Sequence, residues 1–195
     1  MAKRQAILEA AQTLFLRQGY DGSSMDAIAT EAGVSKLTVY SHFNDKESLY
    51  AAAVKARCEQ GLPSLIFERS PDESVEAVLQ RIGVAYIELV NSPASIALHR
   101  LLLSPSGHEL PLARSFYEIG PRRVLIDVAE LLQRLQQGGQ LQFENVYRAA
   151  EHLLCMLKGG ANFRLMLECP EPPSALPPEQ HVAEVVALFI RAYRP

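Results

Sequence analysis

Residues 23–50 read Ser-Ser-Met-Asp-Ala-Ile-Ala-Thr-Glu-Ala-Gly-Val-Ser-Lys-Leu-Thr-Val-Tyr-Ser-His-Phe-Asn-Asp-Lys-Glu-Ser-Leu-Tyr. The first part of this stretch has apolar residues at helical spacing, which predicts a short helix with one apolar face. These residues are Met25, Ile28, Ala29 and Ala32. Ser23 or Ser24 is a suitable N-cap, because a serine hydroxyl accepts a hydrogen bond from an otherwise unpaired backbone N–H. Gly33 predicts the end of the helix, since glycine adopts the left-handed conformation without a side-chain clash.

A second short helix is predicted directly after the glycine. Ser35 is its expected N-cap, and Val39 and Phe43 are expected to face inward. Its outward face is then polar and is formed by Lys36, Thr38, Ser41 and His42. A third helix is predicted to follow, with Asn44 as its N-cap and Glu47 three residues later, as in a capping box.

Two short helices joined by a tight turn with a glycine indicate a helix-turn-helix unit. The second helix of such a unit fits the major groove of DNA, where base edges are accessible. The same pattern is also compatible with an ordinary helical corner in an all-α domain. The motif alone does not decide between the two, and its sequence context has to be used.

The surrounding residues resemble the TetR family of bacterial transcriptional regulators. The resemblance is carried by residues 7–11, 14–15 and 19–20 before the unit, by Gly33 to Phe43 within it, and by Asp45 to Leu49 after it. It is dense over about the first fifty residues and diffuse beyond them. Leu37 is a departure, because the family often has glycine there. Its larger side chain either approaches a base methyl group or covers the helix.

The resemblance implies which residues touch DNA. Tyr40 and Lys46 match positions that usually contact phosphate, and Ser24 matches a phosphate contact at a helix N-terminus. The complete candidate set for DNA binding is Ser24, Ser35, Lys36, Leu37, Thr38, Tyr40, Ser41, His42 and Lys46. Two alternatives stay open: Tyr40 packs half-buried in the small domain, or His42 is exposed without contacting DNA.

The charge balance does not by itself predict a nucleic-acid binder. The net charge of the chain is −3, and residues 1–53 contain one more acidic than basic residue. Placement therefore has to matter. We expect the basic side chains Lys3, Arg4, Lys36 and Lys46 to share one face, with Asp26 and Glu31 pointing elsewhere. So few phosphate-neutralising groups predict a modest dependence of DNA binding on salt.

Composition indicates a folded protein. The 195 residues are 48% apolar and 21% charged, which is typical of a globular chain with a buried core. No apolar run approaches the ~20 residues needed to cross a bilayer. Residues 1–6 lead into a charged amphipathic helix rather than a signal peptide, so we expect a cytoplasmic protein that does not bind membranes.

Neither a metal site nor an active site is expected. Cys58, Cys155 and Cys169 show no pairing or zinc-ligand spacing. The histidines at 99, 108 and 152 also lack a regular metal-ligand spacing. The chain contains no nucleophile–base motif and no phosphate-binding loop, so we expect no cofactor and consider an all-helical enzyme the weakest interpretation.

The rest of the chain is predicted to be helical as well. Gly120-Pro121 should divide or kink one of the later helices, and Gly159-Gly160 should bend another or allow close packing of a second chain. Loops are expected at 104–107 and 169–178. The expected helices span about 2–18, 45–60, 71–90, 93–103, 110–137, 143–167 and 178–193.

These elements predict an all-α fold with two domains. Residues 1–53 form a three-helix DNA-binding domain with the helix-turn-helix, and residues 54–195 form a helical ligand-binding and dimerisation domain. The resemblance implies a homodimer held together by the helices at about 143–167 and 178–193, since one short helix reads only a few base pairs. Their apolar faces also serve, at least in part, as the core of a monomer.

A ligand pocket is expected among the central helices. Its candidates are polar or adaptable residues in apolar surroundings, which suits a small, largely apolar ligand. They are Tyr86, His99, Arg100, Phe116, Tyr117, His152, Met156 and Asn162. The resemblance implies a repressor on palindromic operator DNA, released when the effector binds and shifts the helix at 45–60. The alternative is a dimeric DNA-binding protein without a small-molecule ligand.

Overall fold

The computed structural model describes residues 2–70, 72–103 and 110–195, with the backbone alone for residues 110–112. All the regular structure in these residues is helical, so the expected all-α fold is confirmed. The chain forms two compact units: residues 1–60 with 97–121, and residues 61–96 with 122–195. The expected loop at 104–107 and His108 lie outside the described residues. The expected functional boundary between residues 53 and 54 stays a prediction.

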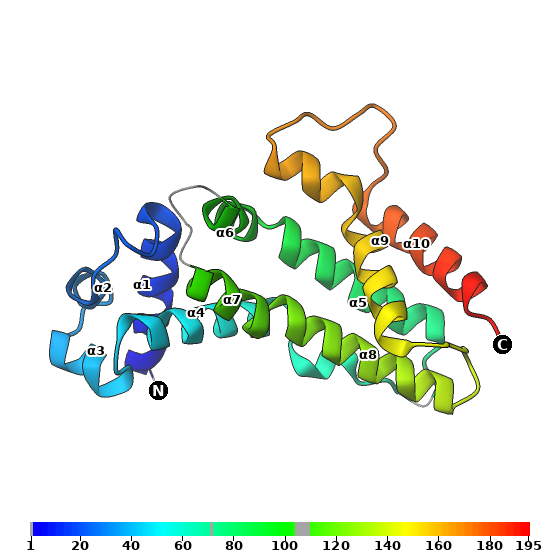
Figure 1. Cartoon of the computed structure of the whole chain (residues 1–195), viewed down its shortest axis with the longest axis horizontal. Helices are drawn as coiled ribbons and strands as arrows, with labels where there is room; N and C mark the ends of the chain where they lie inside the picture. The colour runs from blue at the N-terminus through cyan, green and yellow to red at the C-terminus, as the bar shows by residue number, and fades with distance from the viewer. Residues whose placement is uncertain (1, 71, 104–109) are drawn as a thin grey trace. The chain divides into compact units, whose positions relative to one another are not determined.

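The first unit is built around the helix-turn-helix (Figure 1). Helix α2 packs on both α1 and α3, and Gln12 of α1 donates a hydrogen bond to the backbone oxygen of Ala53 in α4 at 2.9 Å. The helices of this unit are α1 (Ala2–Gln18), α2 (Met25–Glu31), α3 (Lys36–His42), α4 (Lys46–Gly61) and α7 (Leu110–Ile119), with the second half of α6 (Pro93–Leu103).

The turn between α2 and α3 has the predicted geometry. Ser24 Oγ accepts a hydrogen bond from Ala27 N at 3.1 Å and caps α2, so of the two serines it is Ser24 that acts as the cap. Gly33 has φ of +65°, in the left-handed region where a β-carbon is unfavourable. Ser35 caps α3 by accepting from Thr38 N at 3.2 Å. These three residues hold α2 and α3 at their angle to each other.

The predicted cap of α4 is wrong by one residue. Asp45, and not Asn44, accepts a hydrogen bond from Ser48 N at 2.7 Å, and Ser48 takes the place expected for Glu47. The Ser48 hydroxyl completes the cap by donating to the backbone oxygen of Asp45 at 2.9 Å. Asp45 prevails because its carboxylate is a stronger acceptor than an amide oxygen and stabilises the first turn of a helix by its charge.

The second unit contains η1 (Ser64–Phe67), α5 (Val75–Asn91), α8 (Pro121–Gln137), α9 (Val146–Met166), α10 (Pro178–Ala192) and the start of α6. Two predicted starts are wrong. Helix α5 begins at Val75 rather than near 71, because Ser74 caps it through Ala77 N at 3.1 Å. Helix α9 begins at Val146 rather than Phe143, because Asn145 Oδ1 caps it through Arg148 N at 2.9 Å. The division at Gly120-Pro121 is confirmed, since α7 ends at Ile119 and α8 begins at Pro121.

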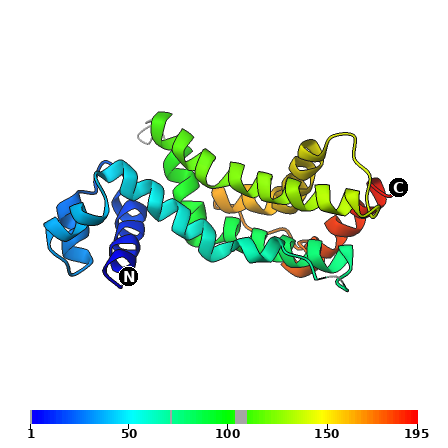
Figure 2. The ribbon, with the colours of Figure 1, turned by 90° about the horizontal axis from the view of Figure 1, so that it is seen from below.

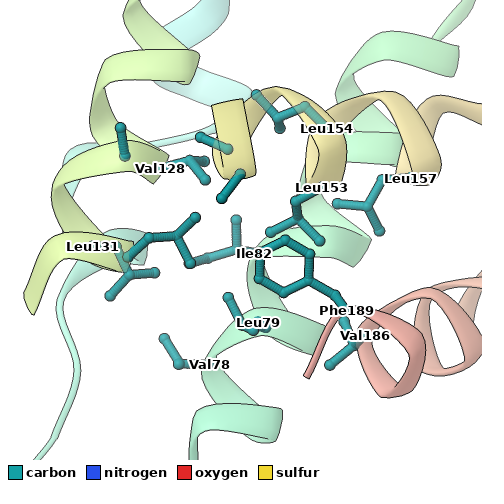
Figure 3. Packing of buried hydrophobic residues seen from close by; sticks show 14 of the residues in the cluster. Val78, Leu79, Ile82, Val128, Leu131, Leu153, Leu154, Leu157, Val186 and Phe189 are labelled. Carbon is teal, nitrogen blue, oxygen red and sulfur yellow. The ribbon is translucent and has the colours of Figure 1, made fainter. Parts of the chain in front are cut away.

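Four helices supply most of the core of the second unit. Figure 3 shows Ile82 of α5, Leu131 of α8, Leu153 of α9 and Phe189 of α10 pointing toward one another. All four side chains are buried, so α5, α8, α9 and α10 share one apolar interior. Gly83 lets α5 and α10 approach closely, since a β-carbon there would lie 2.7 Å from Val182 Cγ1.

Helix α9 bends at Gly159, as expected from the glycine pair. Gly159 has φ of +52° and ψ of −165°, which interrupts the helix. The imidazole of His181 in α10 lies with Nε2 3.0 Å from the backbone oxygen of Leu157, just before the bend. Figure 2 shows α8 leading into the turn at 138–145, after which α9 begins. The α10 histidine therefore supports the α9 backbone where its regular hydrogen bonding is broken.

No helix in the described part of the chain is long and apolar enough to cross a membrane.

Candidate nucleic-acid interface

The outward face of α3 is centred on Leu37 and Ser41. These two residues are one helical turn apart and lie on the side opposite Val39 and Phe43, which are buried in the first unit. Leu37 is 80% exposed, and Tyr40 on the flank of the same face is 43% exposed. At this exposure more than half of the surface of Tyr40 is covered, so half-buried packing and contact with phosphate both stay open for this residue.

Three polar side chains of this face are already joined by local hydrogen bonds. The hydroxyls of Ser35 and Thr38 lie 2.9 Å apart, and Ser41 Oγ donates to the backbone oxygen of Thr38 at 2.7 Å. These bonds fix the side-chain rotamers on the surface of α3. A hydroxyl that is both donor and acceptor retains the capacity for a further contact with a base or a phosphate.

Lys36 is paired with Asp26 of α2. The ammonium group lies 2.8 Å from Asp26 Oδ1 and donates to Oδ2 at 3.0 Å, and both side chains are exposed. The hydrogen bond to Asp26, together with its negative charge, raises the pKa of Lys36 above its usual value. The expectation that Asp26 points away from the basic residues is wrong. Asp26 and Lys36 are ten residues apart in the sequence, but the packing of α2 on α3 brings their side chains together.

Lys46 is held by the loop before α2. Its ammonium group donates to the backbone oxygen of Tyr20 at 3.0 Å and lies 4.1 Å from the centroid of the Tyr20 ring. The same ring stacks on Phe15, at 5.7 Å between centroids, and meets Tyr50 edge-on at 5.5 Å. This aromatic cluster positions Lys46 at the start of α4, a role for Tyr20 that the sequence pattern did not reveal.

A second cation–π contact joins α1 to the end of α3. The guanidinium of Arg4 lies 5.3 Å from the centroid of the Phe43 ring. Residues Arg4, Lys36 and Lys46 are thus each held by a partner within the first unit. All nine candidate DNA-binding residues belong to this unit, between Ser24 at the start of α2 and Lys46 at the start of α4.

Half of the ligand candidates lie in the second unit. Tyr86 on α5 is largely buried, and this burial raises the pKa of its phenol to about 12. Asn162 on α9 is 1% exposed, and its amide nitrogen donates to Val90 O at 3.2 Å and to Asn91 Oδ1 at 2.8 Å. Met156 packs partly buried against the core, whereas His152 is exposed and bonded to the Tyr193 hydroxyl at 2.7 Å.

The amide oxygen of Asn162 is the unusual atom of this set. It is buried and has no hydrogen-bond partner among the described residues. A buried, unsatisfied acceptor carries a desolvation penalty that a ligand donor would relieve. Asn162 is therefore the candidate with the clearest unused binding capacity.

The other ligand candidates lie in the first unit. The His99 ring on α6 meets Phe116 of α7 edge-on at 5.4 Å between centroids. Arg100 is part of α6, and Tyr117 of α7 is largely exposed. The eight candidates are thus divided equally between the two units rather than gathered within one of them.

A cavity of about 460 Å³ in the second unit was not anticipated from the sequence. It is lined by Ser64, Phe67, Glu68, Arg69, Asp127, Glu130 and Arg134. Both arginines already donate hydrogen bonds to backbone oxygens of nearby residues, Arg69 to Glu73 O at 2.7 Å and Arg134 to Phe67 O at 3.0 Å. Burial raises the pKa of Asp127, although Arg123 lies 3.4 Å away and opposes this effect. Within the described residues no group of three or more His, Cys, Asp or Glu side chains is placed to hold a metal ion.

Two family descriptions match the chain. "Bacterial regulatory proteins, tetR family" matches residues 7–53, the part that contains α2 and α3. "AefR-like transcriptional repressor, C-terminal domain" matches residues 77–195, more than half of the chain. The chain belongs to the TetR family.

Two solved structures resemble the chain over nearly its full length. A TetR-family transcriptional regulator from Mesorhizobium loti MAFF303099 is 32% identical, with a TM-score of 0.79, over 99% of this chain and 97% of the other. The "Flavonoid-responsive Regulator FrrA" is 30% identical, with a TM-score of 0.79 and the same coverage. The TetR fold therefore extends over both units, each taken by itself.

Curated relatives are matched over part of their length. SrpR of Pseudomonas putida, an "HTH-type transcriptional regulator", is 29% identical over 138 residues, which cover 71% of this chain and 63% of SrpR. IcaR of Staphylococcus aureus, a "negative transcriptional regulator" of a biofilm operon, is 31% identical over 103 residues, 46% of this chain and 55% of IcaR. The chain thus spans less than two thirds of the length of these two relatives.

The family assignment decides the class of function. The protein is a TetR-family transcriptional regulator with repressors among its relatives, and members of this family are regulators rather than enzymes. TetR-family regulators bind operator DNA, usually as dimers. The expected regulator and helix-turn-helix are confirmed, whereas the individual site residues stay predictions.

Proposed function

We propose that the protein is a repressor that binds palindromic operator DNA as a homodimer and is released by a small, largely apolar ligand. The observation that carries this proposal is the outward face of α3, which is exposed around Leu37 and Tyr40 while Val39 and Phe43 anchor the helix. The matched family region, residues 7–53, includes this helix in full. A helix of this kind reads base edges in the major groove.

The DNA contacts divide into two groups by chemistry. Lys36, Tyr40 and Lys46 bind phosphate, and Ser24 accepts a similar role at the start of α2. Ser35, Leu37, Thr38, Ser41 and His42 face the bases or the groove wall. Lys36 exchanges its exposed Asp26 partner for a phosphate, since an exposed ion pair is weakly stabilising and is displaced by a stronger anion.

Dimerisation supplies the second reading helix. One α3 has seven residues and reaches only a few base pairs, so two copies are needed for a specific site. Large apolar side chains are exposed on and just after the two helices expected to form the interface. They are Tyr147, Phe163, Leu165, Leu167 and Leu188. Exposed apolar residues of this density on two adjacent helices support an isologous contact between copies.

Ligand binding is supported by the second unit. The buried Asn162 amide oxygen has no partner in the described part of the chain, and Tyr86 offers a buried phenol on the neighbouring helix α5. FrrA, similar over nearly the whole chain, is described as flavonoid-responsive. Flavonoids are therefore the first ligand class to test, because their rings are apolar and their hydroxyls donate to such an acceptor. The protein acts on DNA in the cytoplasm in this proposal.

The decisive experiment measures DNA binding. Wild-type protein is titrated against labelled DNA flanking its own gene, followed by fluorescence anisotropy at several salt concentrations. Lys36→Ala and Tyr40→Ala are expected to weaken binding roughly tenfold each, and Lys36→Ala should also reduce the salt slope by about one per subunit. Lys55→Ala is the matched control, because Lys55 is an exposed lysine on α4 paired with Glu59. Unchanged DNA binding in both Lys36→Ala and Tyr40→Ala would refute the proposed contact surface.

A second experiment tests release. Thermal-shift measurements with a panel of flavonoids identify a binder, and the same binder is then added to the protein–DNA complex. We expect DNA binding to be lost in parallel with ligand saturation. Asn162→Leu should lower the affinity for the ligand without lowering the affinity for DNA. A compound that binds tightly yet leaves DNA affinity unchanged refutes ligand-controlled release and favours a regulator that only dimerises and binds DNA.

A further inference from the structure

We propose that Leu37 reads the C5-methyl group of a thymine in each half-site, so that an apolar contact contributes to operator specificity. This inference rests on the proposed DNA-binding function and names one base feature for it. It starts from the position of the side chain. Leu37 is 80% exposed, the highest value among the exposed large apolar side chains of the described residues.

Leu37 lies at the centre of the outward face of α3. The buried residues Val39 and Phe43 define the inner side of the helix, and Leu37 with Ser41 lies on the opposite side. Lys36 and Tyr40 flank Leu37 on one side of this face. A helix that enters a groove with its outer side leading therefore presents Leu37 to the base edges and Lys36 and Tyr40 to the backbone.

The exposure argues against a structural role for this side chain. A leucine that covers its own helix packs on neighbouring side chains and loses much of its solvent-accessible surface. Leu37 retains 80% of it, and it does not belong to the apolar cluster of the first unit. A single exposed leucine does not by itself require a partner, but the apolar surface of Leu37 lies at the centre of the face that α3 presents to a groove.

The major groove offers one apolar group on its base edges, the methyl group of thymine. The polar side chains around Leu37 are held by local hydrogen bonds, which limits what else the centre of this face presents to a base. Ser41 Oγ donates to Thr38 O at 2.7 Å, and the Thr38 hydroxyl lies 2.9 Å from that of Ser35. These bonds hold the polar side chains beside the helix backbone and leave the leucine as the longest group at the centre of the face. A thymine methyl is therefore the base feature that Leu37 fits.

The test replaces thymine by uracil, which differs only in lacking the methyl group. Wild-type protein first selects duplexes from a random DNA library, and each thymine of the selected site is then changed to uracil singly. At one position in each half-site, uracil is expected to weaken wild-type binding about fourfold, and more than tenfold when both half-sites are changed. Leu37→Ala should bind the thymine and uracil duplexes equally well.

Two further variants separate the possible outcomes. Lys36→Ala should bind more weakly but keep the thymine–uracil difference, because its role is on phosphate. Leu65 is also an exposed leucine but lies in the second unit, so Leu65→Ala should behave as wild type. If wild-type and Leu37→Ala protein lose the same affinity with uracil at every position, the methyl contact is refuted while DNA binding stands. If wild-type protein enriches no duplex, the proposed function itself fails and this inference falls with it.

Discussion

The ammonium group of Lys36 lies 2.8 Å from Asp26 Oδ1, so an acidic side chain of α2 holds the first basic residue of α3. Both side chains are exposed, and water and salt therefore screen their attraction. In the proposed complex Lys36 binds a phosphate instead, and Asp26 competes with DNA for it. The pair thus sets how readily Lys36 is released to the DNA backbone.

Replacing Asp26 by asparagine should strengthen DNA binding. The substitution removes the competing carboxylate, and the affinity for the selected duplex is expected to rise roughly two- to fivefold at low salt. Anisotropy titrations with Asp26→Asn, Lys36→Ala and the double variant measure this effect. In the Lys36→Ala background the gain should shrink. An equal gain in both backgrounds would show that Asp26 acts on DNA directly rather than through Lys36.

The cap of α4 predicts a dependence of stability on pH. Hydrogen bonds from Ser48, backbone first and side chain second, hold the pKa of Asp45 below its ordinary value of 3.8. A lowered folded-state pKa means that the carboxylate stabilises the fold above its ordinary pKa. That contribution is lost as pH falls from about 3.8 through the lower folded-state value.

Asp45→Asn should therefore melt at a lower temperature than wild type near neutral pH, and the difference should narrow below the ordinary aspartate pKa. Thermal unfolding followed by circular dichroism across this pH range measures it. Glu47→Gln is the control, since Glu47 was the residue expected from the sequence to complete the cap. If Glu47→Gln lowers the melting temperature near neutral pH as much as Asp45→Asn does, and its difference from wild type also narrows at low pH, the assignment of the cap to Asp45 is incorrect.

The positions of helices were largely predictable from the sequence, whereas side-chain partners were not. Gly33, Ser35 and the division at Gly120-Pro121 act locally, and local signals are present in the sequence itself. The choice between Asn44 and Asp45 as a cap depends on a difference of one residue, which periodicity does not resolve.

The partners of the candidate site arise from packing. Asp26 lies ten residues from Lys36, and Tyr20 lies 26 residues from Lys46, so neither pair follows from a helical repeat. The ligand candidates show the same limit. Polar residues among apolar ones were found in both units, but only the geometry reveals that the Asn162 amide oxygen is buried without a partner among the described residues.

The bend in α9 predicts an intolerance of alanine at Gly159. Its φ of +52° with ψ of −165° is a conformation available essentially to glycine alone. Gly159→Ala should destabilise the fold by about 1–3 kcal/mol through backbone strain. A β-carbon there would be 3.5 Å from the His181 ring, an ordinary contact, so a clash is not the cause. Urea unfolding at constant m-value measures the loss.

The adjacent glycine supplies the control for this measurement. A β-carbon at Gly160 would lie 3.1 Å from Nη1 of Arg164, the far end of a long side chain. Gly160→Ala should therefore be nearly neutral, since alanine also favours the helix. Equal destabilisation by the two substitutions would indicate that α9 tolerates no side chain at the bend, whatever the backbone conformation.

The last prediction concerns the contact between two copies. Leu188 of α10 is 52% exposed in the single copy and lies on one of the two helices proposed to form the dimer. Leu188→Glu places a charge in that interface without disturbing the buried core of the second unit. The variant should stay folded but sediment as a monomer at concentrations where wild type is a dimer, because a charge without a partner is strongly disfavoured in an apolar contact.

Its matched control is Leu65→Glu, the same substitution at a leucine of η1 that is 71% exposed. Leu65→Glu should leave both sedimentation and DNA binding unchanged. Leu188→Glu should in addition lose specific DNA binding while its circular dichroism and melting remain those of a helical protein, because a monomer has one α3 and reads only one of the two half-sites at a time. A Leu188→Glu protein that is still dimeric and binds the selected duplex normally would place the interface on another surface.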